Sequence, residues 1–388
     1  MIDFEPRKAE MIALLKRLVE TESPSHDKAA VDNVGRIVAD ECRKLGAEVD
    51  VVENPITGNQ VVAHFSPSPA GSGARGDDGL LPLPQKEMRV LLLHHMDTVY
   101  PLGTLAKMSF YEKDGKIFGP AVADMKGGIV ISLAALAALK DAGQLTRPVT
   151  ALFTSDEEIG SHTSRTLIED LARQAALALV FEAGLLDGAL KTWRKGMGVF
   201  TVKVKGRAAH AGGRHQDGRN AIEELAHQVI AIQQMTDYAK GTTFNVGMIR
   251  GGTTNNVVPD EAEALVDFRV LVPEETERVY AAMRALRPVT PGTSVEASGG
   301  LNRPPMPNDA LMQATFARAQ QIAASLGMEL KAGGSGGGSD GNFVAPLGVP
   351  LLDGLGACGD GAHSEREYIL AESLSERARL VAALIREW

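Results

Sequence analysis

The chain has 388 residues, of which 44% are hydrophobic and 23% are charged, a composition typical of a folded, soluble protein. One compact hydrophobic core rarely serves a chain of this length, so we expect two domains. The net charge of -9 and the isoelectric point near 5.6 argue against a nucleic-acid partner and an anionic membrane surface, because both require clustered Lys and Arg.

The cysteines and the first residues indicate a cytoplasmic location. Cys42 and Cys358 are far apart in the sequence, and two such thiols do not form the disulfide framework of a secreted protein. The opening residues MIDFEP lack the basic and apolar regions of a secretion signal. No apolar run is predicted to reach the ~18 residues that a membrane span needs, so we expect no membrane partner.

Two helices and a strand are predicted near the start of the chain. Apolar residues recur at helical spacing over residues 7–20 and again from about 29 to 45, whereas 49–52 favours a short strand. Residues 66–86 are rich in Pro, Gly and Ser. Because they lack apolar periodicity, we interpret them as an exposed, partly disordered loop.

Short apolar runs follow at residues 89–95, 149–154 and 177–181, with a helical pattern at 128–139. Such runs are typical of buried, parallel strands. Strands that alternate with helices predict an α/β sheet with helices on both faces.

The pattern changes after Trp193. Residues 198–205 alternate between apolar and polar, as a half-exposed antiparallel strand does. A helix over 220–238, strands over 243–249 and 262–271, and a helix over 274–286 complete a small α+β block. We therefore expect a catalytic domain in two parts, 1–194 and 305–388, with a second domain inserted at 195–304.

Histidines and carboxylates stand at the ends of the predicted strands. Ligands bind outside the carboxyl ends of the strands in open α/β sheets, so these side chains are expected to converge. They are His95 and Asp97 after the strand 89–95, Asp124 before the helix 128–139, Glu157 and Glu158 after the strand 149–154, Glu182 after the strand 177–181, and His363 in a late loop. Imidazole nitrogen with carboxylate oxygen suits Zn2+, with Mn2+ or Co2+ as substitutes. One ligand from each of these five positions, two histidines and three acids in all, would match two metals that share one bridging carboxylate.

Each residue taken alone has a simpler interpretation. His95 could be a structural histidine and Asp124 a helix N-cap. Adjacent acids such as Glu157 and Glu158 usually lie on a solvated face. The residues alone leave both interpretations open.

Seven stretches carry a resemblance that covers nearly the whole chain. They are HHMDTVYP (94–101), GPAVADMKGG (119–128), TSDEEIGS (154–161), FEAG (181–184), GRAAHAG (206–212), NNVVPDEAEALVDFR (255–269) and GAHSE (361–365). In this order they resemble the two-zinc carboxypeptidase and deacylase family, which includes glutamate carboxypeptidase, acetylornithine deacetylase, succinyl-diaminopimelate desuccinylase and aminoacylase. Among these members, the stretches are most similar to those of glutamate carboxypeptidase. The resemblance implies a zinc-peptidase-type catalytic domain, with a mixed, mostly parallel sheet between helices, and an inserted α+β lid or dimerisation domain.

The resemblance also implies roles for the candidate metal ligands. Asp124 would bridge two zinc ions, for which Co2+ or Mn2+ could substitute. His95 and Glu182 would complete one metal site, and Glu158 and His363 the other. Asp97 would orient the imidazole of His95 from outside the ligand set, and the bond between Asp124 and Met125 would be cis.

Glu157 is implied as the general base, and His210 as the donor that stabilises the oxyanion. By resemblance, His210 reaches across from a partner subunit, so a homodimer is expected. Arg269 and Asn256 would hold the free carboxylate of the substrate, for which a guanidinium is well shaped. The Gly-rich run 333–340 resembles a loop beside the site. A flexible linker is its simplest interpretation, but the stretch GGGSD shortly before His363 favours a pocket wall whose backbone approaches the substrate closely.

These inferences lead to two hypotheses of different classes. The first is a two-zinc hydrolase that releases a C-terminal amino acid, such as glutamate, from a peptidyl or N-acyl group. N-acyl amino-acid deacetylase chemistry is the close alternative within it. The second is an inactive, metal-free relative that binds acylated amino acids.

Overall fold

The chain divides into two compact units in a computed structural model that describes residues 2–68 and 89–388. Unit 1 comprises Met1–Thr192, Asn308–Gly334 and Ser339–Trp388. Unit 2 comprises Trp193–Pro307 and Ser335–Gly338. The sequence analysis expected an inserted domain at 195–304. Of the loop predicted at 66–86, residues 69–86 lie outside the described residues.

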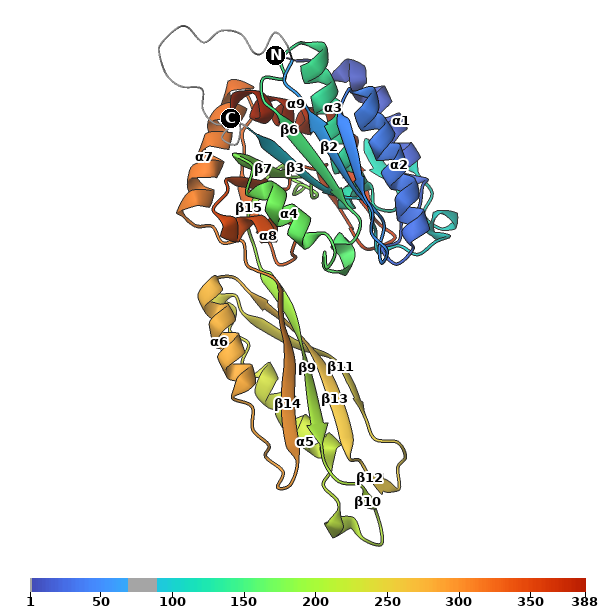
Figure 1. Ribbon diagram of the computed structural model, residues 1–388, viewed down its shortest axis with the longest axis vertical. Coiled ribbons are helices and arrows are strands. Elements are labelled where there is room, and N and C mark those ends of the chain that lie inside the picture. Colours follow the sequence, from blue (N-terminus) through green and yellow to red (C-terminus); the bar gives the residue numbers. More distant parts are fainter. Residues whose placement is uncertain (1, 69–88) are drawn as a thin grey trace. The chain divides into compact units, whose positions relative to one another are not determined.

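Unit 1 is built on an eight-stranded sheet (Figure 1). In spatial order its strands are β1 (Glu48–Val52), β2 (Gln60–Phe65), β6 (Val149–Thr154), β3 (Val90–His95), β7 (Leu177–Val180), β16 (Leu351–Asp353), β8 (Leu190–Arg194) and β15 (Ala332–Ser335). The pairs β6–β3, β3–β7 and β7–β16 are parallel, whereas β1–β2, β2–β6 and β16–β8 are antiparallel. The predicted mixed sheet is confirmed, and the four central strands pair in parallel.

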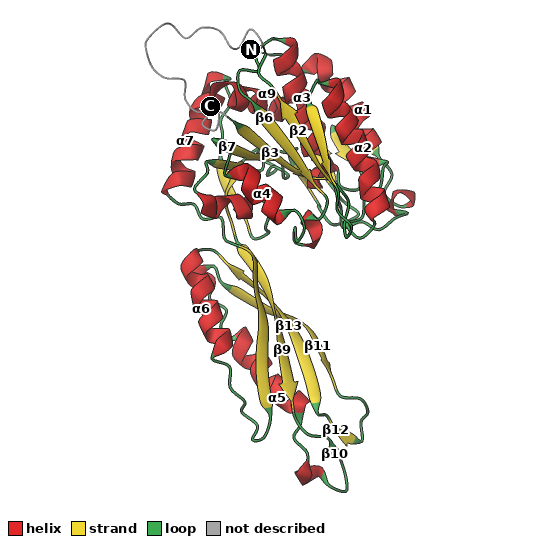
Figure 2. Ribbon diagram, in the orientation of Figure 1, coloured by secondary structure: helices red, strands yellow, loops and turns green. Residues whose placement is uncertain are grey.

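Helices cover both faces of this sheet (Figure 2). Helices α3 and α4 both contact the central strand β3, and Figure 1 shows them on opposite sides of it. The helices of unit 1 are α1 (Lys8–Val19), α2 (Lys28–Lys44), α3 (Gly127–Asp141), α4 (Arg165–Ala172), α7 (Ala310–Ser325), α8 (Gly341–Val344) and α9 (Ala371–Glu387). All residues of β3 and β6 are buried, as strands covered on both faces must be.

A smaller four-stranded sheet completes unit 1. Its strands, in spatial order, are β17 (Gly359–Asp360), β18 (Tyr368–Leu370), β5 (Lys116–Phe118) and β4 (Tyr111–Lys113). All three pairings in this sheet are antiparallel. The loop between β17 and β18 carries His363, so this sheet positions one of the candidate ligands.

One segment of unit 1 corrects the sequence analysis. Among the described residues, Val122–Asp141 is long and apolar enough, by composition, to cross a membrane. However, 83% of its most apolar window is buried inside the structure, because α3 packs into the hydrophobic core. The statement that no run has this length was wrong, and burial explains the apolar character of the helix.

Unit 2 is a four-stranded antiparallel sheet with two helices on one face (Figure 2). Its strands, in spatial order, are β11 (Thr243–Gly251), β13 (Glu261–Val270), β9 (Gly196–Lys205) and β14 (Ser294–Arg303), and its helices are α5 (Ala221–Gln233) and α6 (Pro273–Arg284). A short pair, β10 (Ala209–His210) and β12 (Val257–Val258), extends from it. Burial alternates strictly along β9 and β13, which confirms the predicted half-exposed antiparallel strand.

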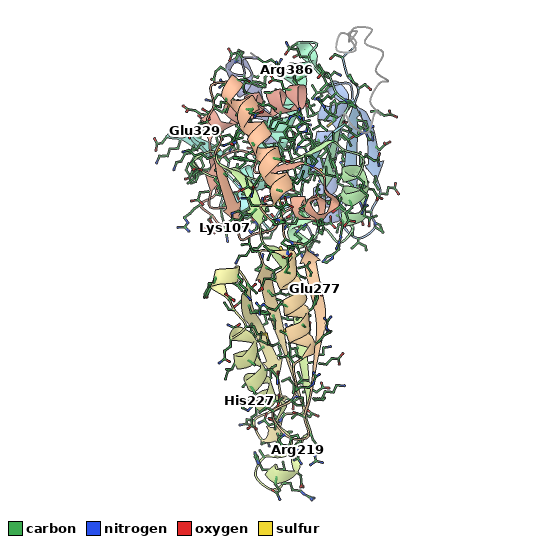
Figure 3. All side chains as sticks on the ribbon, turned by 90° about the vertical axis from the view of Figure 1, so that its left-hand side faces the viewer. Lys107, Arg219, His227, Glu277, Glu329 and Arg386 are labelled. Carbon is green, nitrogen blue, oxygen red and sulfur yellow. The ribbon has the colours of Figure 1, made fainter. Side chains whose placement is uncertain are left out.

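Several polar and charged side chains labelled in Figure 3 lie on the outside of the two units. Lys107 and Glu329 are exposed on unit 1, and His227 and Glu277 are exposed on unit 2. Buried ionisable groups therefore stand out from this background, because burying a charge is costly unless it is paired.

Gly128 at the start of α3 allows this helix to approach the end of strand β7. A Cβ atom at Gly128 would lie 2.1 Å from the backbone oxygen of Phe181, and a backbone atom cannot move without the strand. We expect Gly128→Ala to lower the free energy of unfolding by about 1–3 kcal/mol, as overpacking does. Chemical denaturation measures this change.

Gly336→Ala is the matched control. No heavy atom lies within 4 Å of a Cβ atom built at Gly336, so the change in stability is expected to stay within ~0.5 kcal/mol. Equal stability of the two variants would contradict the tight approach at Gly128.

Candidate metal centre

The carboxyl ends of three parallel strands bring the candidate ligands together. His95 is the last residue of β3 and lies opposite Thr154, the last residue of β6. Glu157 and Glu158 follow β6 in a short 3-10 turn, and Glu182 follows β7. The sheet register therefore places these side chains at one edge.

His94 and His95 show how strand geometry separates neighbouring residues. Successive side chains of a strand point to opposite faces. His94 stacks between the rings of Phe153 and Phe181, at centroid distances of 4.4 and 4.5 Å. Burial lowers the pKa of His94 to about 3, so it is a neutral core residue and only His95 faces the cluster.

Asp124 lies between two imidazoles. Its Oδ1 is 3.0 Å from Nε2 of His95, and its Oδ2 is 3.2 Å from Nε2 of His363. One carboxylate thus presents a different oxygen to each histidine. This is the arrangement that a carboxylate bridging two metal ions requires.

A glutamate accompanies each of the two imidazoles. Oε1 of Glu182 is 3.7 Å from Nε2 of His95, and Oε2 of Glu158 is 3.2 Å from Nε2 of His363. Each half of the cluster therefore offers one nitrogen, one glutamate oxygen and one oxygen of Asp124. The structure brings together the five ligands that the sequence suggested, and this donor set fits two zinc ions that keep open positions.

Glu157 lies beside the ligands. Its carboxylate, the imidazole of His95 and the carboxylate of Glu182 offer ligand atoms within 4.8 Å of one another. A side chain at this distance can reach a water molecule held by the cluster.

Asp97 contacts His95, as the sequence suggested, and also contacts the turn after β6, which the sequence did not reveal. Nδ1 of His95 is 3.0 Å from the backbone oxygen of Asp97 and 3.6 Å from its carboxylate. The carboxylate itself accepts the backbone N–H groups of Glu157 and Glu158, at 3.1 and 3.2 Å. Asp97 therefore leaves Nε2 of His95 for the cluster and also anchors the turn that carries both glutamates.

Hydrogen bonds set the protonation of the two imidazoles. Burial alone would lower the pKa of His95, but Asp124 and Asp97 raise that pKa well above its usual range. Hydrogen bonds to Asp124 and Glu158 raise the pKa of His363 to about 11. Without a bound cation, the neighbouring carboxylates therefore favour the protonated form of both imidazoles, whose charge balances part of the carboxylate charge.

The backbone around the cluster is unusual. The Asp124–Met125 peptide bond is cis, as the resemblance implied. Ala121 and His363 have φ values of 59° and 63°, in the left-handed region that residues other than glycine seldom adopt.

The Gly-rich run 333–340 ends in packed structure. Asp340 is buried and accepts hydrogen bonds from Ser161 Oγ at 2.5 Å and from Thr154 Oγ1 at 3.1 Å. This end of the run is therefore fixed to the end of strand β6, which does not fit a flexible linker.

The other three candidate site residues belong to unit 2. The backbone N–H of Ala211 donates to the carbonyl of Asn256 at 3.0 Å, so Asn256 and His210 are neighbours at the β10–β12 pair. Arg269 is near the opposite end of strand β13, whose first residue is Glu261. That strand separates Glu261 from Arg269 by roughly 27 Å, at about 3.4 Å per residue.

Comparisons with known proteins agree with this geometry. Residues 91–387 match the model of peptidase family M20/M25/M40. The chain is 30% identical to carboxypeptidase G2 of Pseudomonas sp. (strain RS-16), over 97% of this chain and 89% of that protein. It is 27% identical to succinyl-diaminopimelate desuccinylase of Thioalkalivibrio sulfidiphilus, over 75% of this chain and 81% of that protein.

Solved structures share the fold. Aminopeptidase PepT from Bacillus cereus superposes with a TM-score of 0.77 at 21% identity, over 98% of each chain. The YXEP protein of Bacillus subtilis, a dinuclear metal-binding peptidase, superposes with a TM-score of 0.68 at 15% identity, over 99% of each chain.

The chain therefore belongs to peptidase family M20/M25/M40. Within that class it is a metal-dependent amidohydrolase. The family that the seven sequence stretches indicated is confirmed, as is the mixed α/β fold class. An active enzyme is favoured over the metal-free binding protein.

Metal binding is expected to release protons, because each imidazole must lose the proton on Nε2 before it can bind an ion. The pKa of His363, raised to about 11 by its carboxylate partners, implies that apparent metal affinity rises with pH through the neutral range. Isothermal titration calorimetry with zinc, in buffers of different ionisation enthalpy, counts the protons released. Affinity that is constant between about pH 6 and pH 8 would contradict this assignment.

Proposed function

We propose that the chain binds two zinc ions and releases a C-terminal amino acid, such as glutamate, from a peptidyl or N-acyl group. The observation that carries the proposal is Asp124, whose two carboxylate oxygens face the imidazoles of His95 and His363 at 3.0 and 3.2 Å. Bound zinc would make a shared water acidic enough to act as hydroxide near neutral pH. Co2+ or Mn2+ could replace it with the same ligands.

In this proposal, Glu157 is the general base. It takes a proton from the attacking water and delivers it to the leaving amine. Its position beside His95 and Glu182 supports this role. Asp97 fixes the turn of Glu157 through a hydrogen bond of 3.1 Å to its backbone N–H.

His210 is proposed to donate to the oxyanion of the tetrahedral intermediate. Its Nδ1 accepts the backbone N–H groups of Gly212 and Gly213, at 3.1 and 3.0 Å. An acceptor at Nδ1 places the proton of the neutral ring on Nε2. The exposed His210 is thereby prepared as a hydrogen-bond donor before the substrate arrives.

Arg269 is proposed to bind the free carboxylate of the substrate. Its Nε and one terminal nitrogen contact the two carboxylate oxygens of Asp267 at 2.9 and 3.0 Å. This bidentate pair orients the guanidinium in advance, which reduces the ordering cost of binding an anion.

The distance within unit 2 supports a homodimer. Asn256 and His210 lie together at the β10–β12 pair. Arg269 lies eight residues along strand β13 from its first residue, Glu261, a separation of roughly 27 Å at about 3.4 Å per residue. A single amino-acid product cannot contact both groups. If Asn256 and Arg269 act on the same carboxylate, a second copy of the chain supplies one of them, and His210 arrives with Asn256.

The acyl group is the less defined half of the substrate. Similarity to carboxypeptidase G2 over 97% of this chain favours carboxypeptidase chemistry. Similarity to a succinyl-diaminopimelate desuccinylase over 75% of this chain keeps N-acyl amino-acid deacetylation as the second candidate. We propose that the substrates are small acyl-amino acids or peptides in the cytoplasm.

Glu157→Ala tests the base. We expect kcat to fall by about 10²–10⁴-fold, the usual contribution of a general base. Metal content should stay near that of the wild type, because all the proposed metal ligands remain. The assay uses folate-type acyl-glutamates, N-acetyl amino acids and dipeptides, and metal is measured by elemental analysis.

Glu329→Gln is the control, because Glu329 is an exposed surface carboxylate of unit 1 (Figure 3). Wild-type turnover in Glu157→Ala would rule out Glu157 as the base. The substrate cleaved by the wild type also decides between the carboxypeptidase and deacetylase candidates.

Subunit mixing tests the second copy. His210→Ala and Glu157→Ala subunits are each expected to be inactive, but a mixed dimer would combine one intact Glu157 with one intact His210. Random mixing is expected to restore about one quarter of the wild-type activity in a twofold-symmetric dimer. Absence of recovery in verified mixed dimers would exclude the action of His210 across subunits.

A further inference from the structure

Glu367 is a buried carboxylate that accepts four hydrogen bonds next to the candidate metal centre. Its side chain is almost fully buried, with an exposure of 1%. Oε2 accepts from the hydroxyl of Tyr100 at 2.5 Å and from the backbone N–H of Ala121 at 3.0 Å. Oε1 accepts from the backbone N–H groups of Ala123 and Asp124, at 2.8 and 3.1 Å.

These contacts connect the segments that carry the ligands. Tyr100 belongs to the segment that continues from His95 after strand β3. Ala121, Ala123 and Asp124 form the bend before α3, where the bridging carboxylate is located. Glu367 itself is four residues after His363, in the same loop.

The bend before α3 requires such an acceptor. Ala121 and Ala123 are buried, and Ala121 has a φ of 59°, so their N–H groups are presented to the interior of the unit. A buried N–H group without an acceptor costs about 1–3 kcal/mol. A carboxylate, which carries about four lone-pair positions, can serve all the donors of this bend at once.

The same count argues against Glu367 as a metal ligand. An ionised carboxylate has about four acceptor positions, and the four hydrogen bonds use them. Glu367 therefore acts on the centre through the backbone of Asp124.

We propose that Glu367, assisted by Tyr100, is a positioning residue that holds Asp124 between the two imidazoles so that both metal sites form together. This inference rests on the proposed two-metal site. It predicts that loss of the Glu367 carboxylate weakens metal binding while leaving the substrate-binding residues unchanged.

The test compares Glu367→Gln with wild type in the full chain. A carboxamide replaces one acceptor oxygen by an N–H donor that faces other donors, so Asp124 should lose its fixed position. Zinc affinity, measured by competition with a chromogenic chelator, is expected to fall about 10–100-fold, as for other groups that support metal ligands. Raising the zinc concentration is expected to restore kcat, with KM for the substrate unchanged.

Two further variants keep the result interpretable. Tyr100→Phe removes a single hydroxyl and is expected to weaken zinc binding several-fold, which decides the question if Glu367→Gln fails to fold. Glu372→Gln, at an exposed position on α9, should bind zinc as the wild type does.

Wild-type zinc affinity in a folded Glu367→Gln variant would overturn the positioning role and leave the two-metal site standing. So would unchanged affinity in Tyr100→Phe when Glu367→Gln does not fold. A wild-type protein that binds no metal would instead overturn the proposed function itself.

Discussion

The crowding of negative charge at one edge of the sheet is the constraint on which the site depends. Asp124, Glu158 and Glu182 converge on two imidazoles at distances of 3.0 to 3.7 Å. Carboxylates this close repel one another unless cations lie among them. Protons on the imidazoles supply part of that charge, and two divalent ions would supply it more completely. The fold must therefore hold side chains in an arrangement that their mutual repulsion opposes.

The scaffold meets this demand in two layers. The inner layer is the buried parallel core, where strands β3 and β6 have no exposed residue and so present His95 and the glutamate turn from a rigid support. The outer layer consists of Asp97 and Glu367. Asp97 accepts two backbone N–H groups and Glu367 accepts three, all from residues of the cluster or its flanks. Irregular backbone, which has no ladder of its own, is thereby fixed by side-chain carboxylates.

The central strands and their terminal ligands could be predicted because the signals are local. An apolar run marks each buried strand, and the rule for strand ends then places His95, Glu158 and Glu182 at one edge. Strand β14 was not predicted, since Gly299 and Gly300 weaken its propensity, and its antiparallel pairing with β9 overrides that weakness. Contacts between residues far apart in the sequence could not be predicted either, because they leave no local pattern. For example, nothing in the sequence around Glu367 indicates that its carboxylate accepts a hydrogen bond from the backbone N–H of Asp124.

The separation of groups within unit 2 follows from the strand predicted over residues 262–271, which the structure contains as β13, and it bears on how the proposed enzyme would work. Asn256 and Arg269 are only thirteen residues apart in the sequence, yet the extended β13 strand places most of its length between them. A helix over the same residues would have kept Asn256 and Arg269 within about 20 Å, at 1.5 Å per residue. An extended strand carries them farther apart. In the proposed dimer, this strand length decides which subunit provides each substrate contact. In that proposal unit 1 alone would hold the metals, whereas recognition of the substrate and stabilisation of its oxyanion would need two chains together.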